Sequence, residues 1–139
     1  MSVGSAGTAA SGIGRRFARQ TQELTSIRRF VRTWFEARDV DPAAIDDLEL
    51  AVSELATNAI QHGSGDVIEV ELAAEPAELV AIVAADSEHL ERIGDVRSWH
   101  IAPPDAVNGR GLGIVAAVMD EIEFSADQGR AVFRCRRRR

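Results

Sequence analysis

The sequence has a single cysteine, Cys135, and no apolar run that approaches the ~20 residues of a membrane-spanning helix. One cysteine excludes a disulfide within the chain and fits a reducing cytoplasm, so we expect a cytoplasmic protein without a membrane segment. The N-terminus also lacks the basic start and continuous apolar stretch of a secretory signal peptide. Residues 1–14, which are rich in glycine, alanine and serine, instead predict a disordered leader.

A dominant positive charge is missing as well, since the formal net charge is −6 and the isoelectric point is near 5.1. This balance argues against direct binding of nucleic acid. Four consecutive arginines end the chain, and we expect a domain over residues 15–136 followed by a solvated basic tail at residues 137–139. The three histidines show no paired ligand spacing, so metal-hydrolase chemistry is not predicted, and Cys135 is expected to be structural.

The 139 residues are 45% hydrophobic and 27% charged, which predicts one ordinary globular domain. Helical and strand periodicities alternate along it. In chain order we expect a short first strand at 15–20, helices at 24–35 and 42–62, strands at 68–72 and 79–85, a long loop at 87–108, a helix near 112–119 and a hairpin of strands 121–126 and 130–136. Adjacent strands with helices gathered separately predict an α+β fold, a two-layer sandwich.

The second helix has recognisable ends. Asp41 is expected to cap its free N–H groups, and Pro42 is tolerated at the first helical position. Gly63 is expected to stop the helix.

Glu54 and Asn58 on this helix form the first candidate site. Residues four apart share a helix face, so the two side chains point the same way, and His62 extends the row. A carboxylate can deprotonate a nucleophile, and an asparagine carbonyl is a hard oxygen ligand suited to Mg²⁺. The alternative is an exposed polar face with a routine pair of side chains.

The glycine-rich segment from Asn108 to Gly113 is the second candidate. Glycines let backbone N–H groups approach phosphate closely, and the helix expected to follow attracts anions at its N-terminus. The segment is neither a Walker loop, because no Gly-Lys-Ser/Thr follows, nor a Rossmann turn, because no strand immediately precedes it. The alternative is a flexible turn that leads into a helix.

Asp86 is the third candidate, at the end of an apolar strand. Its carboxylate could accept a hydrogen bond from an exocyclic amine such as that of adenine, and the alternative is a strand-ending aspartate in a turn. The order of the three candidates supplies a metal ligand, a base-recognising group and a phosphate clamp.

The segment Leu50–Gly63 resembles the N box of GHKL ATPases, and more narrowly that of the anti-sigma-factor serine kinases of the RsbW/SpoIIAB type. Gly109–Val115 resembles their second glycine box, and the resemblance covers roughly residues 15–135. It implies a Bergerat-type ATP-binding fold with a mixed sheet covered by helices on one face. It also implies an ATP:protein serine kinase whose partners are an anti-sigma-factor antagonist, which supplies the acceptor serine, and a sigma factor, with a homodimer as a further expectation.

The resemblance implies a role for each candidate residue. Asn58 would hold Mg²⁺ on the ATP phosphates, Glu54 would be the general base, and Asp86 would bind the adenine amino group. The lid over the triphosphate would consist of Gly109, Arg110, Gly111, Leu112 and Gly113.

One stretch departs from the family pattern. The first glycine box usually reads Asp-x-Gly-x-Gly, whereas here Asp86 is followed by Ser-Glu-His-Leu without glycine. This departure leaves a second hypothesis open, a regulatory module that binds nucleotide weakly or not at all and acts by protein contact. A histidine kinase core is not expected, because 139 residues leave no room for a phosphoacceptor helix pair.

Overall fold

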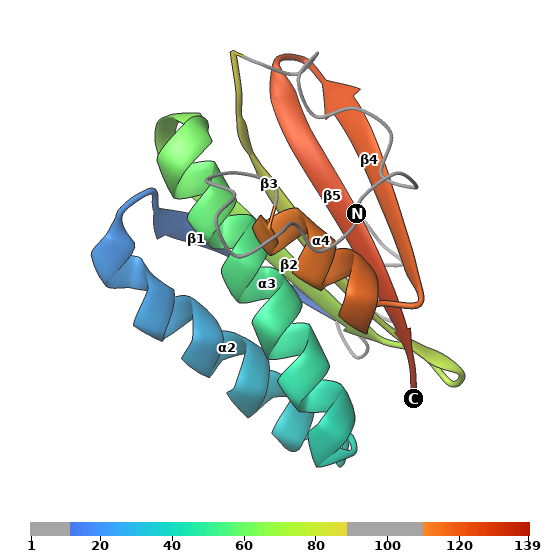
Figure 1. Ribbon diagram of the computed structural model, residues 1–139. Coiled ribbons are helices and arrows are strands. Elements are labelled where there is room, and N and C mark those ends of the chain that lie inside the picture. Colours follow the sequence, from blue (N-terminus) through green and yellow to red (C-terminus); the bar gives the residue numbers. More distant parts are fainter. Residues whose placement is uncertain (1–11, 89–109) are drawn as a thin grey trace, which may run out of the picture.

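The computed structural model describes residues 12–88 and 110–139, in which helices lie on one side of a five-stranded sheet (Figure 1). The elements in chain order are β1 (Gly12–Ala18), the 3-10 helix η1 (Thr21–Glu23), α2 (Leu24–Glu36), α3 (Pro42–His62), β2 (Ser64–Ala74), β3 (Glu78–Asp86), α4 (Arg110–Val118), β4 (Glu121–Asp127) and β5 (Arg130–Arg138). α3 lies between α2 and α4 (Figure 1). None of the helices in the described part of the chain is long and apolar enough to span a bilayer.

The sheet has the strand order β1-β2-β3-β5-β4, and each neighbouring pair is antiparallel. The expected two-layer α+β arrangement is confirmed, but the expected mixed sheet is wrong for the described strands. Two hairpins, β2–β3 and β4–β5, supply four of the strands, and they meet at β3 and β5 running in opposite directions. In the second hairpin Gln128 and Gly129 both have positive φ, as a tight two-residue turn requires.

Both ends of the domain are longer than expected. β1 begins at Gly12, where it pairs with Ala73 of β2, so the last residues of the expected leader belong to the sheet. The other leader residues lie outside the described part of the chain. β5 continues to Arg138, so the tail predicted at residues 137–139 is mostly strand.

Acidic partners explain why the arginine-rich end of the chain is ordered as a strand. Arg136 forms ion pairs with glutamates of β3 and β4. The Arg137 Nε donates to Asp47 Oδ2 on α3 at 2.9 Å, and the Arg138 N–H donates to Asp120 Oδ2 at 2.7 Å. Pairing with these carboxylates replaces the solvation that we expected for a free tail.

The ends of α3 are built differently from the expected caps. The side chain of Asp41 makes no capping hydrogen bond, so that prediction is wrong; its backbone carbonyl accepts from the Ile45 N–H at 3.0 Å, and Pro42 occupies the first turn. Gly63 does end the helix, with φ −81° rather than a left-handed conformation. Glycine is required there for space, because a Cβ would lie 2.4 Å from the Ala59 carbonyl oxygen.

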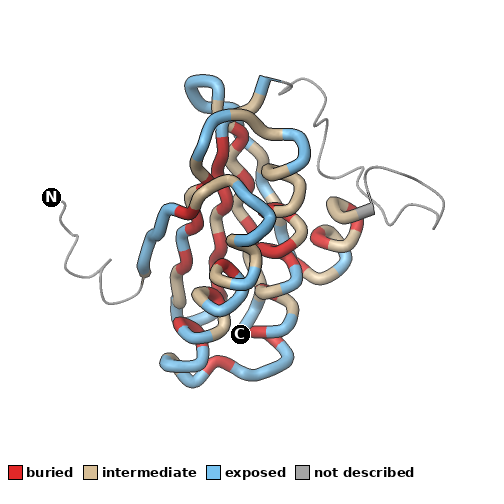
Figure 2. Tube along the Cα trace, turned by 90° about the vertical axis from the view of Figure 1, so that its left-hand side faces the viewer, coloured by how far each residue is buried: buried red, intermediate tan, exposed pale blue. Residues whose placement is uncertain are grey.

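The hydrophobic core fills the layer between the helices and the sheet, and Figure 2 shows buried segments along both. The apolar stripe that the sequence predicts on α3 is buried, as are the inward positions of the central strands. The largest fully buried side chains include Phe35, Ile27, Ile45, Leu48, Leu55, Ile68, Leu72 and Leu79.

Replacing Leu48 by alanine should lower the free energy of unfolding by about 2–5 kcal/mol, because the change leaves a cavity in a close-packed core. Leu50 on the same helix is the matched control, since its exposed fraction is 40% and that of Leu48 is 0%. Leu50→Ala should change stability by no more than about 0.5 kcal/mol in urea unfolding. Equal losses for the two variants would contradict the burial described for α3.

Burial raises the pKa of the Cys135 thiol to about 12. The pKa of a cysteine in the unfolded chain is about 8.5, so the folded state disfavours the thiolate. The contribution of the protonated thiol to the free energy of unfolding is therefore fully present below about pH 8.5. This contribution is lost as the pH rises towards the pKa of Cys135 in the folded protein. The sequence contains no tyrosine and no lysine, so Cys135 is the one side chain of the sequence expected to titrate between these limits.

The free energy of unfolding should therefore fall between pH 9 and pH 11, by at most about 1.4 kcal/mol per pH unit. Urea unfolding across this range measures it, and Cys135→Ala serves as the control with a flat profile. The same slope in both proteins would show that the thiol is not responsible.

Candidate functional site

α3 presents Glu54 and Asn58 one turn apart on its polar side. Ser53 and Leu55, on either side of Glu54, are buried, whereas Glu54 and Asn58 are half-buried and His62 is exposed at the end of the helix. Among the described residues the Asn58 amide has no hydrogen-bond partner. The row predicted from the spacing is therefore present, and the Asn58 amide in its middle has no hydrogen bond to the residues that the structure describes.

The first turn of α4 lies directly against Glu54. A Cβ built on Gly111 would lie 2.7 Å from the Glu54 Oε2 and 3.6 Å from its carboxyl carbon. The fold thus brings together two candidates that are far apart in the sequence. The carboxylate lies beside the N-terminal turn of a helix, where the helix dipole favours negative charge.

The glycine-rich segment is partly helical. Gly111, Leu112 and Gly113 lie inside α4, whose first residue is Arg110, rather than in a loop ahead of it. Leu112 packs against the core and Gly113 is buried. Gly109 lies outside the described residues, as do the loop expected before it and the His89 part of the altered first glycine box.

Asp86 is the last residue of β3, as expected, and its exposed carboxylate lies against Gly65. A Cβ on Gly65 would lie 2.6 Å from the Asp86 Oδ2, and Gly65 has φ +73°, a conformation that favours glycine. A Cβ on Gly63 would lie 3.1 Å from the Asp86 carbonyl oxygen. Asp86 is thus packed against the backbone that follows α3.

The candidates therefore follow one line along α3. Asp86 lies at the C-terminal end of the helix and the first turn of α4 lies at Glu54, with Asn58 between them. The helical rise of about 1.5 Å per residue separates Glu54 from His62 by about 12 Å along the axis.

Contacts from α2 fix the inner side of this helix. The Arg28 Nε donates to the Ser53 Oγ at 2.9 Å, and the Thr57 Oγ1 donates to the Ser53 carbonyl at 2.8 Å. Arg32 of α2 also joins the two helices, through hydrogen bonds to Asp46 and Glu49 of α3. These bonds raise the pKa of its guanidinium, and the bond to Asp46 has the larger effect. Ser53, which precedes Glu54, is thus held against α2, while the Glu54 carboxylate lies beside Gly111 of α4.

Residues 17–135 match the family described as the histidine kinase-like ATPase domain. The chain is also 32% identical over 101 residues to the anti-sigma F factor of Clostridium acetobutylicum, an alignment that covers 68% of this chain and 71% of that protein. The chain belongs to the histidine kinase-like ATPase family, in its anti-sigma-factor kinase group. The resemblance inferred from the N box and the glycine box is confirmed.

Further relatives agree with this assignment. The serine-protein kinase RsbW of Bacillus pumilus is 32% identical over 97 residues, which cover 61% of this chain and 60% of that kinase. The crystal structure of the RsbU and RsbW domains of a Mycobacterium tuberculosis protein superposes with a TM-score of 0.68 at 17% identity, over 91% of this chain and 32% of that one. A chain in the crystal structure of the SiaB–SiaC complex from Pseudomonas aeruginosa gives a TM-score of 0.68 at 16% identity, over 97% of this chain and 95% of that one. At these identities the two structures confirm the fold.

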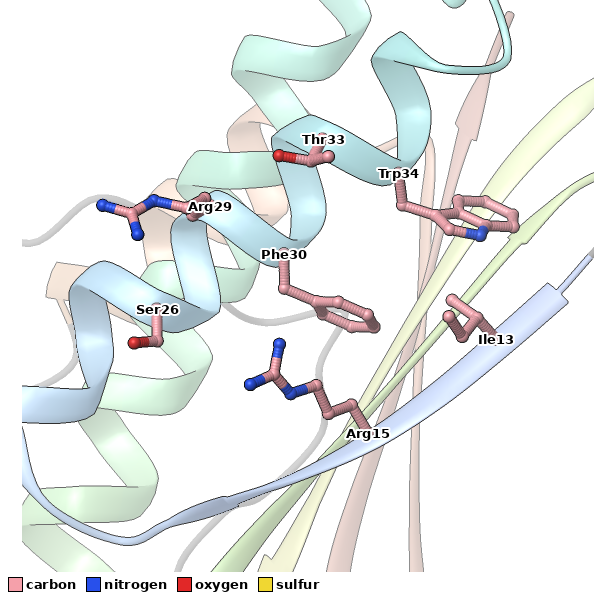
Figure 3. Close-up of a pocket in the computed structure, with 7 residues that line it drawn as sticks. All are labelled: Ile13, Arg15, Ser26, Arg29, Phe30, Thr33 and Trp34. Carbon is pink, nitrogen blue, oxygen red and sulfur yellow. The ribbon is translucent and has the colours of Figure 1, made fainter.

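A separate groove of about 400 Å³ lies between β1 and α2 of this ATPase-family domain. Figure 3 shows Phe30 and Trp34 of α2 above Ile13 and Arg15 of β1. The Arg15 guanidinium carbon is 4.8 Å from the Phe17 ring centroid. The lining includes none of the candidate residues on α3, β3 or α4, so the groove is not part of the candidate site.

Two residues of the site's surroundings were not found from the sequence. Gly65 had a weak signal, since it follows Gly63 by two residues after a helix. Arg19 had none: its side chain donates to two backbone carbonyls, those of Ile60 and Gly65, that come close only in the fold.

The contact between Glu54 and α4 can be tested by stability alone. Gly111→Ala should gain helix propensity but force the Glu54 carboxylate to move. In a Glu54→Ala background nothing has to move, so the same substitution should be more favourable there by about 0.5–1 kcal/mol. Urea unfolding of the four proteins measures this coupling, and a coupling near zero would mean that the two residues are not in contact.

Proposed function

We propose that this domain binds MgATP along α3 and transfers the γ-phosphoryl group to a serine of an anti-sigma-factor antagonist protein, and that it also sequesters a sigma factor. The observation that carries the proposal is the placement of the Glu54 carboxylate against Gly111 in the first turn of α4. Asp86 lies at the other end of the same line, where a base would be recognised.

The roles follow the chemistry of each side chain. Asp86 accepts a hydrogen bond from the adenine amino group, and the first turn of α4, with Gly109 and Arg110 ahead of Gly111, Leu112 and Gly113, closes over the phosphates. Glycine at position 111 leaves room for backbone to approach closely, since even one added carbon would meet Glu54.

The donor set fits Mg²⁺. The described residues contain no group of three histidine, cysteine or acidic side chains that would form a closed metal cage. Mg²⁺ usually takes one or two protein oxygens together with substrate phosphates, and the side-chain carbonyl oxygen of Asn58, which has no hydrogen bond to the described residues, would be such a ligand. Mg²⁺ bound there would neutralise charge that develops on the phosphates.

Glu54 is the proposed general base. It accepts the proton of the acceptor serine hydroxyl as the serine oxygen bonds to the γ-phosphorus, and the bond from that phosphorus to the bridging oxygen breaks to release ADP. The neighbouring contacts of Ser53 with Arg28 and Thr57 keep the helix turn that carries Glu54 in place.

The names of the relatives support the choice of partners. One is an anti-sigma F factor and one is the serine-protein kinase RsbW. A homodimer and the absence of direct nucleic-acid binding are part of the same proposal. The alternative, a regulatory module that acts by contact alone, is favoured by one observation, the Ser87 and Glu88 side chains that follow Asp86 in place of glycine-box backbone.

Transfer of radiolabel from ATP to a cognate antagonist tests the proposal. Glu54→Gln should reduce the transfer rate by about 10²–10⁴-fold, because the carboxylate no longer accepts the proton, while MgATP binding is retained. Glu71→Gln, on the exposed part of β2, is the control and should transfer at the wild-type rate.

The possible failures have different meanings. Intact transfer by Glu54→Gln would show that Glu54 is not the base. Failure of the wild-type protein to bind ATP at millimolar concentration would reject the kinase and leave the regulatory module.

A further inference from the structure

Arg19 ties together two backbone segments that border the proposed base end of the site. It follows β1 directly, and its backbone N–H donates to the Asp66 carbonyl at 2.8 Å. Its side chain reaches further, with Nε donating to the Gly65 carbonyl at 2.7 Å and Nη1 donating to the Ile60 carbonyl at 2.8 Å. One half-buried guanidinium therefore joins the end of α3 to the start of β2.

The regular secondary structure leaves both carbonyls, those of Ile60 and Gly65, in need of a hydrogen-bond donor. Ile60 is in the last turn of α3, where carbonyls lack helical partners and a positive charge is favoured by the helix dipole. Gly65 has φ +73°, and the pairing of β2 with β3 is irregular between Ser64 and Ile68. The regular strand ladder therefore does not hold Gly65 in place, and the guanidinium supplies a charge-assisted bond there.

Gly65 in turn is the surface on which the Asp86 side chain rests, since an added Cβ would lie 2.6 Å from the Asp86 Oδ2. We propose that Arg19 is a positioning residue for base recognition: by fixing the Gly65 backbone it fixes the Asp86 carboxylate relative to α3, and so sets the preference for ATP over GTP. This inference rests on the proposed nucleotide site.

The chemistry explains why the preference for the base should depend on this clamp. Adenine presents an amino group to Asp86, whereas guanine presents a carbonyl oxygen at the same position, which a carboxylate repels. Discrimination of this kind requires a carboxylate held in one place. Glu54 lies more than one turn before Ile60. The Ser53 contact with α2 and the first turn of α4 hold that part of the helix, so the phosphate end does not depend on Arg19.

The test compares Arg19→Met, which keeps the length of the side chain and removes its donors, with Arg16→Met on the exposed side of β1. The Kd values for MgATP and MgGTP are measured by calorimetry, and that for magnesium tripolyphosphate by competition. Arg19→Met should weaken MgATP binding about tenfold and lower the ATP-over-GTP ratio by a similar factor, as expected for a lost charge-assisted bond. Binding of tripolyphosphate, which has no base, should change less than about twofold by the same argument, and Arg16→Met should behave as wild type.

A double variant separates positioning from general loosening of the fold. In an Asp86→Ala background, Arg19→Met should cause no further loss of ATP affinity, because the residue it positions is gone.

Three results would overturn the inference. They are an unchanged ATP-over-GTP ratio, an equal loss of ATP and tripolyphosphate affinity, or a further loss in the Asp86→Ala background. Each of these results concerns the variants and counts only if the wild-type protein itself binds ATP. Absence of both ATP and tripolyphosphate binding in the wild-type protein would instead overturn the proposed function, and this inference with it.

Discussion

Burial of one side of α3 between the sheet and its neighbouring helices is the constraint on which the rest of the site depends. Leu48, Val52 and Leu55 are fully or almost fully buried, so the helix has one rotational setting about its own axis. That setting leaves Glu54 and Asn58 on the side that faces α4 and solvent. The hydrophobic core therefore determines the direction of the polar side chains.

The middle and the C-terminal end of α3 then become the two ends of the proposed site. At one place the first turn of α4 approaches so closely that a Cβ at position 111 would displace the Glu54 carboxylate. At the other, Gly63 and Gly65 allow the chain to turn into β2 against Asp86. At Gly63 and Gly111 glycine allows neighbouring atoms to approach closely, whereas at Gly65 it allows a left-handed backbone conformation. The same residue type therefore meets two different physical requirements.

The sequence predicted the elements that are governed by local periodicity. The α2 and α3 helices, the β4–β5 hairpin and the position of Asp86 at a strand end all follow from hydrophobic spacing and turn residues. Features set by long-range partners were missed. The arginines at the end of β5 looked like a solvated tail because the carboxylates of Asp47 and Asp120 that pair with them are distant in the sequence.

The same limit applies to the site. Spacing placed Glu54 and Asn58 on one face, but no local pattern could show that Gly111 packs on Glu54 or that Arg19 clamps Gly65. The mixed sheet implied by resemblance was also wrong for the described strands, because strand direction depends on how the two hairpins meet. Family resemblance was a better guide to the kind of site than to the contacts that build it.

The central claim is that one nucleotide site runs along α3 from Asp86 to the first turn of α4. Titration of isotopically labelled protein with MgATP, followed by backbone amide chemical shifts, tests it most directly. The account predicts that the largest shifts occur at Gly63–Gly65, at Asp86 and Ser87, and in the first turn of α4. Shifts concentrated instead along the groove between β1 and α2, at residues such as Ile13 and Thr33, would contradict it.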